Sequence, residues 1–388
     1  MIPQQQNVST VRPLNASINS DKRCVIIDWK DGTTATYPFI WLRDNDPAGF
    51  HPDTRERQFD ITTINLNDEI SKIMLEVDSI EFLWRSEGYT AKYSLSWLYT
   101  HKPGRQKDPV DEVEVSHWRC ELALKGIPRY GAEDLIQSDA ELLTFLRDTR
   151  SRGISIIDGL ADEPESDTTL ASRVGFLRGT NFGHIFEVRS KPQPINLAYT
   201  SLALPMHTDL PNQELAPGYQ FLHCLKNEAV GGGSIFCDGF AIAEDMRESE
   251  PEYFELLANT SIPFRYYDDE FDIRSRQKVI NLDASGSVIE ICFNAHLSDA
   301  LDLPVTSMDA YYRAYQMFML KAKQSFYTVS IKLCPGEMVV FNNRRILHGR
   351  DAFDVQTGVR SLRGFYVDRG EFDSRIRVLA RAELHDRF

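Results

Sequence analysis

The chain has 388 residues, of which 42% are hydrophobic and 26% charged, and a formal net charge of −14. This acidic balance argues against nucleic acid and anionic membranes as partners, because both bind positive protein surfaces. No run approaches the ~18 consecutive apolar residues of a membrane span, and the polar N-terminus lacks the apolar core of a signal peptide. Six scattered cysteines without a C-x-x-C pair indicate reduced thiols, so we expect a cytoplasmic protein.

Two similar segments, 24–42 and 79–98, occur in the first hundred residues. In each, a strand-like run ends in a tryptophan, a charged turn with glycine follows, and a second strand-like run leads into Trp-Leu. The pairs Asp-Gly at 31–32 and Glu-Gly at 87–88 are typical of hairpin turns. We therefore predict a small N-terminal β-domain over residues 1–105, built from two hairpins with tryptophans in its core.

The rest of the chain predicts a second, larger domain over residues 106–388. A charged stretch with prolines, 100–118, is typical of a linker, and a helical pattern from about 130 ends at Gly153. The buried strand GISIIDGL and six further short strand-like runs follow, interrupted by two helical stretches at 241–260 and 307–326. This pattern predicts an α+β, mainly β fold with a jelly-roll (double-stranded β-helix) core and flanking helices. Since neither G-x-G-x-x-G nor a P-loop is present, nucleotide chemistry is not supported.

The stretch MHTDLP places His207 and Asp209 two residues apart. Alone, such an H-x-D pair is more typical of an ordinary polar turn than of half a metal site. Three further residues follow in order, however: Ser234 in GGGSIF, His348 in ILHGRDAF, and Arg360 twelve residues later. Several coordinated elements are far rarer by chance than one. Together they resemble the taurine dioxygenase-like iron(II)/2-oxoglutarate oxygenases.

This resemblance implies that His207, Asp209 and His348 form the catalytic Fe(II)-binding facial triad, which leaves positions open for 2-oxoglutarate and O₂. His207 and Asp209 are expected to alternate along one strand, so that both side chains point the same way. Arg360 would bind the distal carboxylate of 2-oxoglutarate, with Ser234 adding a hydroxyl donor. Alone, this arginine is more typical of a surface ion pair. Related halogenases have a small residue in place of Asp209, so the carboxylate here implies a hydroxylase. The resemblance also implies that ascorbate assists the reaction.

A closer resemblance covers nearly the whole chain. The segments WLRDN at 41–45, RGTNFGHIFEVRSKPQPINLAYTSLALPMHTDL and NNRRILHGRDAF resemble the γ-butyrobetaine dioxygenase family. The resemblance implies a homodimer and a small trimethylammonium zwitterion as substrate. A quaternary ammonium cannot donate N–H hydrogen bonds, so aromatic faces are its natural partners, although each such aromatic residue alone is more typical of core packing. By motif position, the implied cage residues and the asparagines for the acidic end are Phe182, Phe186, Tyr199, Tyr366, Asn196 and Asn294.

Two departures from the family bear on the function. The family's WLRDN is commonly followed by a zinc-binding cysteine cluster, whereas DPAGFHPDTRERQFD contains no cysteine and a single histidine, His51. We therefore expect no structural zinc. The cage also has two phenylalanines where the family tends to have Tyr and Trp, which weakens the cation–π attraction.

Two compounds remain as candidate substrates. γ-Butyrobetaine is the first choice, and its hydroxylation would give carnitine. The alternative is the phosphonate analogue 2-(trimethylammonio)ethylphosphonate, whose acidic head His296 could assist, although a lone histidine is usually a polar surface residue. A non-catalytic metal-binding β-protein is the more distant alternative. Against a zinc hydrolase, no further acid or nucleophile is placed beside the triad.

Overall fold

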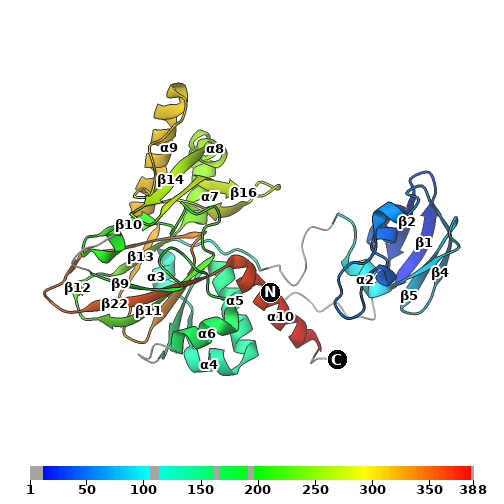
Figure 1. Ribbon diagram of the computed structural model, residues 1–388, viewed down its shortest axis with the longest axis horizontal. Helices are drawn as coiled ribbons and strands as arrows, with labels where there is room; N and C mark the ends of the chain where they lie inside the picture. Colours follow the sequence, from blue (N-terminus) through cyan, green and yellow to red (C-terminus); the bar gives the residue numbers. More distant parts are fainter. Residues whose placement is uncertain (1–11, 105–112, 161–165, 191–195, 386–388) are drawn as a thin grey trace. The chain divides into compact units, whose positions relative to one another are not determined.

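The computed structural model describes residues 12–104, 113–160, 166–190 and 196–385. The chain divides into two compact units, Met1–Lys107 and Asp108–Phe388 (Figure 1). The described residues do not include the first eleven residues or part of the linker predicted at 100–118. The domain boundary predicted between residues 105 and 106 also lies outside them. Within the described ranges, no helix combines the length and the apolar character that crossing a membrane requires.

The N-terminal unit contains two three-stranded antiparallel sheets of the same design. The strands, in sheet order, are β1 (Pro13–Asn19), β2 (Cys24–Trp29) and β3 (Thr34–Pro38) in one sheet, and β4 (Ile70–Leu75), β5 (Ser79–Trp84) and β6 (Thr90–Ser94) in the other. A short helix follows each sheet, α1 (Phe39–Asp44) and α2 (Leu95–Thr100). The two predicted hairpins are therefore confirmed, and each gains one strand on its N-terminal side.

The tryptophans of the repeat occupy two different environments. Trp29 and Trp84 end β2 and β5, and both are buried in the core shared by the two sheets. Trp41 and Trp97 lie on α1 and α2, are half-buried, and contact each other with ring centroids 5.6 Å apart. The prediction that the tryptophans form the core is therefore correct for the first pair, whereas the second pair covers the edge of that core.

The segment after α1, where the family commonly has zinc-binding cysteines, is held here by charged and aromatic side chains. The guanidinium of Arg43 lies over the rings of Phe59 and Tyr89, 4.9 and 4.8 Å from their centroids. The Tyr89 hydroxyl donates a 2.6 Å hydrogen bond to buried Asp46, whose carboxylate also accepts from the Ala48 amide. Among the described residues of this unit, no cluster of His, Cys, Asp and Glu side chains has metal-binding geometry.

We expect the N-terminal unit to keep its fold without zinc, because these contacts already connect the segment to the core. The measurement is the zinc content of the purified protein by plasma mass spectrometry, with thermal unfolding before and after chelation. The control is the Asp209→Ala variant, which removes a ligand from the other candidate metal site. Bound zinc in that variant, together with a lower unfolding temperature of the N-terminal unit after chelation, would contradict the prediction.

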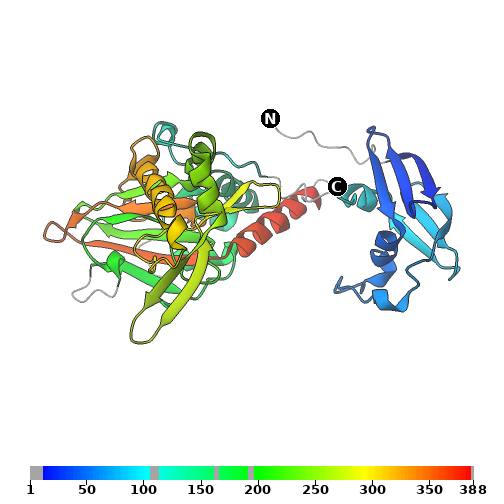
Figure 2. The same ribbon diagram turned by 90° about the horizontal axis from the view of Figure 1, so that it is seen from above.

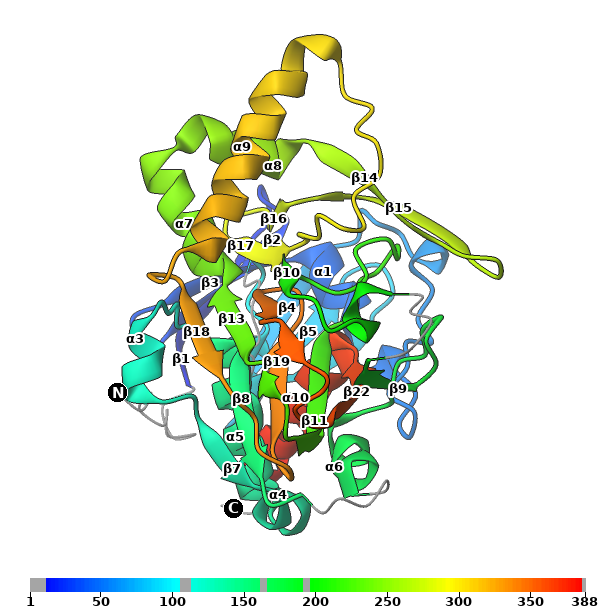
Figure 3. The same ribbon diagram turned by 90° about the vertical axis from the view of Figure 1, so that its left-hand side faces the viewer.

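The C-terminal unit is built around two sheets (Figure 3). The six-stranded sheet has the order β7 (Arg129–Gly131), β8 (Ile154–Asp158), β19 (Met338–Asn342), β11 (Tyr219–Asn227), β22 (Arg360–Val367) and β9 (Ile185–Arg189). The four-stranded sheet has the order β10 (Leu204–His207), β20 (Ile346–Arg350), β13 (Ser234–Asp238) and β18 (Thr328–Ile331). One buried cluster joins the two sheets and includes Phe236 and Phe341. The predicted jelly-roll core is confirmed.

Helices cover the outer face of the six-stranded sheet (Figure 1). They are α4 (Ala132–Gln137), α5 (Asp139–Arg152), α6 (Ser166–Val174) and α10 (Arg369–His385). The helical pattern predicted from about 130 corresponds to α4 and α5, and it ends at Gly153, whose φ of 79° closes the last turn. The sequence analysis did not predict α10, which packs against α5 and the sheet.

A second group of helices and strands lies between β13 and β18 in the sequence and has its own core. It comprises α7 (Gly239–Ser249), α8 (Pro251–Asn259), β14 (Ser261–Tyr267), β15 (Asp272–Lys278), β16 (Ile280–Leu282), β17 (Val288–Ile291) and α9 (Val305–Lys323). The two predicted helical stretches correspond to α7 with α8 and to α9. The β14–β15 hairpin, which the sequence analysis did not predict, projects from the unit (Figure 2). The short elements α3 (Glu121–Lys125), β12 (Val230–Gly231) and β21 (Phe353–Asp354) complete the unit.

Candidate active site

The three predicted metal ligands meet where β10 pairs with β20. His207 lies opposite His348 in the antiparallel register, and their ring centroids are 4.2 Å apart. Asp209 Oδ1 lies 3.2 Å from His207 Nε2 and 3.7 Å from His348 Nε2. One ligand atom from each residue lies within 4.8 Å of the other two, and no further group of this kind occurs among the described residues. Two imidazoles and one carboxylate in this arrangement fit a 2-His-1-carboxylate Fe(II) site.

Asp209 reaches this position through a loop, and the expectation that it would share a strand with His207 is wrong. His207 is the last residue of β10, and the next residue leaves the sheet because the Thr208 amide donates to the Phe293 carbonyl at 2.7 Å. Asn343 then holds the backbone of Asp209 on both sides. Its side-chain oxygen accepts from the Asp209 amide at 2.7 Å, and its side-chain amide donates to the Asp209 carbonyl at 3.0 Å.

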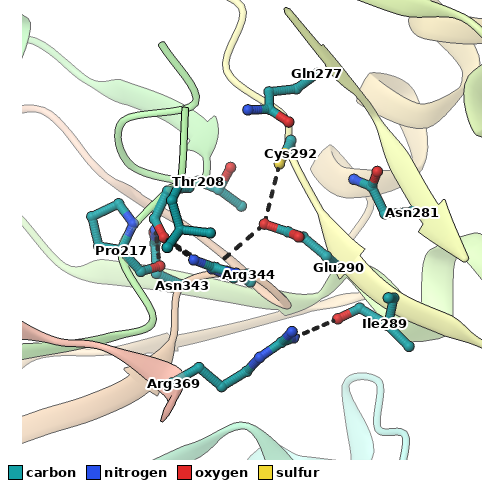
Figure 4. Close-up of polar contacts among 12 residues, drawn as sticks. Thr208, Pro217, Gln277, Asn281, Ile289, Glu290, Cys292, Asn343, Arg344 and Arg369 are labelled. Carbon is teal, nitrogen blue, oxygen red and sulfur yellow. Dashed lines mark hydrogen bonds and ion pairs between the residues drawn. The ribbon is translucent and has the colours of Figure 1, made fainter. Parts of the chain in front are cut away.

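Asn343 lies in the turn between β19 and β20. This turn also anchors the far end of the loop that follows Asp209 (Figure 4). Asn343 also donates to the carbonyl of Pro217 at 3.2 Å, and Arg344 Nε donates to the carbonyl of Ala216 at 2.9 Å. Arg344 is buried and faces Glu290 at 3.5 Å. Burial lowers the pKa of Arg344, although Glu290 opposes this shift. Both ends of the loop therefore rest on the turn between β19 and β20, and β20 carries His348.

The protonation states of the triad suit metal binding. Burial favours the neutral form of Asp209, but the neighbouring His348 and His207 and the Tyr366 hydroxyl outweigh burial and lower the pKa of Asp209 below its ordinary range. Burial, together with His207, lowers the pKa of His348 to about 3. His207 Nδ1 lies 2.8 Å from the carbonyl of Pro205, which can accept but not donate. This contact places the proton on Nδ1 and leaves the Nε2 lone pair for a metal.

All the site residues predicted from the sequence line one cavity with the triad. The cavity has a volume of about 900 Å³, measured out to its open mouth. The remaining predicted residues on its wall are Phe182, Phe186, Tyr199, Tyr366, Asn196, Asn294, Ser234 and Arg360. These side chains come from segments spread over 185 residues of sequence, and the two facing sheets bring them together.

Arg360 is a buried cation without a carboxylate partner among the described residues. It is the first residue of β22 and is 6% exposed. Its Nε donates to the carbonyl of Gly232 at 3.1 Å, and its guanidinium lies 5.7 Å from the Phe353 ring centroid. Burial, with a smaller effect of Arg350, lowers the pKa of Arg360 to about 10, so the side chain stays protonated at neutral pH. A buried charge of this kind is costly unless an anion binds beside it.

The predicted cage residues form two contacting aromatic pairs, and the partner in one of them, Tyr266, does not line the cavity. Phe186 lies against Tyr366 with ring centroids 5.2 Å apart, and Phe182 lies edge-on to Tyr266 at 5.4 Å. Gly364 pairs with Phe186 across β22 and β9, and a Cβ at this glycine would lie 2.6 Å from the Phe186 ring. The glycine therefore gives the ring room to cross the strand. Tyr266, on β14, was missed by the sequence analysis because it belongs to the unpredicted hairpin.

The two asparagines have different local roles. Asn196 accepts from the Ala198 amide through its oxygen, as the cap of the short 3₁₀ helix Leu197–Tyr199. Asn294 is 1% exposed, donates to the Thr208 carbonyl at 3.1 Å and accepts from the Leu297 amide at 3.1 Å. Asn294 therefore braces the strand end next to the triad and keeps one N–H free.

Two further polar residues on the cavity wall were missed by the sequence analysis. Arg350, two residues after His348, is buried and donates to the carbonyls of Ala198, Thr200 and Leu202 at 3.1, 2.7 and 2.8 Å. It fixes the loop that carries Asn196 and Tyr199. Its place in HGR, two residues after the triad histidine, was an available signal.

Gln220 is the other missed residue. It lies on β11, is 2% exposed, and stands inside the apolar run YQFLHCL. A polar residue within such a buried run was the available signal for it.

The fold and the triad together define a class of protein. A family model described as "Taurine catabolism dioxygenase TauD, TfdA family" matches residues 124–366. The chain belongs to this family and is an Fe(II)/2-oxoglutarate-dependent dioxygenase, as predicted. A second model, "Gamma-butyrobetaine hydroxylase-like, N-terminal", matches residues 16–99.

Curated relatives share both parts of the chain. The gamma-butyrobetaine dioxygenase of Pseudomonas sp. (strain AK-1) is 38% identical over 373 residues, covering 96% of this chain and 97% of the relative. The Homo sapiens gamma-butyrobetaine dioxygenase is 32% identical over 367 residues, covering 90% and 93%. The mitochondrial trimethyllysine dioxygenase of Homo sapiens is 27% identical over 356 residues, covering 89% and 83%. The resemblance to the γ-butyrobetaine dioxygenase family is thereby confirmed.

We expect His207→Ala or Asp209→Ala to abolish turnover, because each removes a ligand from the triad. The loss should exceed the 10- to 100-fold effects typical of residues that only support metal ligands. The fold should survive, since the buried clusters of both sheets do not involve these side chains. The measurements are succinate formation, iron content and circular dichroism. Near-wild-type turnover with iron still bound would disprove the triad assignment.

We expect Tyr366→Phe to weaken metal binding by about 10-fold or more, because the Tyr366 hydroxyl donates a 2.7 Å hydrogen bond to Asp209 Oδ2. The phenylalanine keeps an aromatic face in the cavity, so substrate affinity should change less. Titration with Mn²⁺ measures the first effect and the substrate KM the second. Phe186→Leu is the control, since Phe186 contacts the Tyr366 ring but does not hydrogen-bond Asp209. Unchanged metal affinity in Tyr366→Phe would contradict this role.

Proposed function

We propose that this dioxygenase hydroxylates a methylene of a small trimethylammonium zwitterion, with γ-butyrobetaine as the first-choice substrate. The observation that carries the proposal is one cavity whose wall combines the triad, a set of aromatic faces and a buried arginine that has no carboxylate partner among the described residues. Two of the relatives are γ-butyrobetaine dioxygenases and a third is a trimethyllysine dioxygenase. Both substrate names denote compounds with a trimethylammonium group, which supports a cation of this kind.

The aromatic residues would bind the cationic end. Phe182, Phe186, Tyr199 and Tyr366 line the cavity, and each face contributes roughly 0.5–2 kcal/mol of cation–π attraction. Their hydrophobic rings also suit the methyl groups of the cation, because these groups do not hydrogen-bond to protein donors or acceptors. Two phenylalanines in the cage reduce the attraction, because tryptophan and tyrosine have stronger π-faces.

The co-substrate would lie between Arg360 and the triad. The guanidinium of Arg360 and the hydroxyl of Ser234 are expected to bind the distal carboxylate of 2-oxoglutarate, which supplies the missing anion. His207, Asp209 and His348 would hold Fe(II). When bound, iron activates O₂ in a reaction that converts 2-oxoglutarate to succinate and CO₂ and leaves one oxygen atom in a substrate C–H bond. The cage and the asparagines would hold a single methylene in place for this reaction.

The distribution of cations favours a carboxylate over a phosphonate at the acidic end. Two arginines line the cavity. Arg350 is engaged by three backbone carbonyls, and Arg360 is assigned to the co-substrate. Asn196 and Asn294 then remain, and two neutral amides suit a planar carboxylate better than a head with up to two charges.

The alternative substrate is 2-(trimethylammonio)ethylphosphonate. His296 supports it, because this side chain lines the cavity with its ring centroid 4.9 Å from that of His207. An imidazole N–H there would give a three-oxygen head a donor beyond the asparagines. The missing cysteine cluster and the two phenylalanines indicate a divergent member of the family, in which a change of substrate is plausible.

We also infer that the enzyme works as a cytoplasmic homodimer. None of its six cysteines is paired in a disulfide, which fits a reducing compartment. The dimer follows from the resemblance to the γ-butyrobetaine dioxygenase family, and sedimentation velocity of the purified protein measures it directly.

We expect γ-butyrobetaine to be hydroxylated with a higher kcat/KM than the phosphonate analogue. Both compounds, with trimethyllysine as a third, should be assayed side by side for substrate-dependent succinate formation. A ratio above about 100 corresponds to ~2.7 kcal/mol of differential transition-state binding and would identify the physiological class. If kcat/KM is higher for the phosphonate by that factor, the phosphonate becomes the preferred substrate. If only another quaternary amine is turned over, the assignment of the aromatic cage stands, and both candidate acidic groups are wrong.

A further inference from the structure

Tyr266 is a buried residue of β14 that has no role in the functions assigned so far. Side chains alternate along the strand, and the two inward positions before it, Ile262 and Phe264, belong to the core of the group between β13 and β18. Tyr266 is 6% exposed but is not part of that core. Its ring contacts Phe182 instead, with the centroids 5.4 Å apart and the ring planes at 73°. The inward face of β14 therefore ends against a residue of the predicted cage.

Phe182 lies in the turn before β9, and the hydrogen bonds of this turn fix its backbone but not its ring. Thr180 and Gly183 exchange two backbone hydrogen bonds of 3.1 and 2.9 Å, and the Thr180 hydroxyl accepts from the Phe182 amide at 3.1 Å. The direction of the ring depends on the side-chain torsions, which have several staggered minima. A neighbour outside the turn is needed to select one of them, and Tyr266 is in contact to do so.

Tyr266 is itself held at its backbone and at its hydroxyl. Next to it on β14, the Arg265 amide donates to the carbonyl of Leu297 at 2.8 Å, and Leu297 lines the cavity. At the other end of the side chain, the Tyr266 hydroxyl donates to Asp268 Oδ2 at 2.8 Å. The second oxygen of this carboxylate accepts from two backbone amides of the hairpin turn, at 2.9 and 2.7 Å. The β14–β15 hairpin therefore presents a fixed aromatic ring to Phe182.

The direction of the Phe182 ring matters because a cation is attracted to the face of an aromatic ring and not to its edge. We propose that Tyr266 is a positioning residue of the substrate site, which holds the Phe182 ring in the direction in which it meets the trimethylammonium group. Tyr266 does not line the cavity, so it acts through Phe182. The inference rests on the proposed function, because it requires Phe182 to be a cage residue. It does not depend on which of the two candidate compounds is the substrate.

The test is a double-mutant cycle between Tyr266 and Phe182. The dissociation constants of γ-butyrobetaine and of its phosphonate analogue are measured by calorimetry, with 2-oxoglutarate present and Mn²⁺ in place of iron so that no turnover occurs. Phe182→Leu should weaken binding by about 10-fold, as for loss of one aromatic face. Tyr266→Leu should weaken it by about 3- to 10-fold, as for loss of an aromatic pair. The double variant should bind no more weakly than Phe182→Leu alone, because Tyr266 acts through Phe182.

Two further variants and a second ligand separate this role from a structural one. The matched control is Tyr267→Leu, because Tyr267 is the next residue of the same strand but is 68% exposed, and this variant should keep wild-type affinity. Tyr266→Phe retains the ring and removes the hydrogen bond to Asp268, so it should weaken binding less than Tyr266→Leu does. The affinity for 2-oxoglutarate should be unchanged in all the Tyr266 variants, since the contact of Tyr266 is with the cage.

Four results would overturn the proposal. Wild-type affinity in Tyr266→Leu, together with weaker binding in Phe182→Leu, would refute the role of Tyr266 and leave the cage assignment intact. Additive losses in the double variant would show that Tyr266 acts independently of Phe182. An equal loss in Tyr267→Leu, or a parallel loss of 2-oxoglutarate affinity in Tyr266→Leu, would show a general disturbance of the hairpin. Wild-type affinity in Phe182→Leu, or no binding of either compound to the wild type, would refute the proposed function and the inference with it.

Discussion

Asn343 connects the two separate pieces of chain that form the triad. Its side chain accepts from the Asp209 amide and donates to the Asp209 and Pro217 carbonyls, while its own backbone lies in the turn that leads to His348. Asp209 has left the sheet and lacks ladder hydrogen bonds to fix it. The position of the carboxylate relative to both imidazoles therefore depends on this amide and on the β10–β20 pairing that places His207 opposite His348. The rest of the cavity is arranged around that point.

The cavity wall combines groups that are individually unfavourable to bury. Arg360 has no carboxylate partner among the described residues, and the Gln220 amide has no hydrogen-bond partner there. Asp209 stays ionised in an enclosed position because imidazoles and the Tyr366 hydroxyl surround it. Burying these groups costs free energy. The buried clusters of both sheets and the helices over the six-stranded sheet contribute the stability that offsets this cost. A 2-oxo dicarboxylate and a metal would supply the partners that the cation and the triad lack.

In the N-terminal unit, charged and aromatic side chains hold the segment after α1. Cation–π contacts of Arg43 and the hydrogen bond from Tyr89 to Asp46 connect the segment after α1 to the core. A metal cluster gains stability by coordinating several ligands at once, whereas these contacts are separate and weaker. The contacting rings of Trp41 and Trp97, tilted by 35° to each other, add apolar contact between the two repeats. Both repeats thus contribute to one core.

The sequence by itself determined the elements whose signals are local. The hairpin repeat followed from glycine turns and tryptophan spacing, and the α4–α5 segment followed from its periodicity and Gly153. The triad followed from the family resemblance that His207, Asp209 and His348 carry. Long-range contacts lie outside such signals. The departure of Asp209 from its strand depends on Phe293 and on Asn343, 84 and 134 residues further along the chain. The place of Gln220 beside Tyr366 depends on a strand register between segments 146 residues apart. Only the tertiary structure decided these features, because hydrogen bonds and buried charges act between neighbours in space, whatever their separation in sequence.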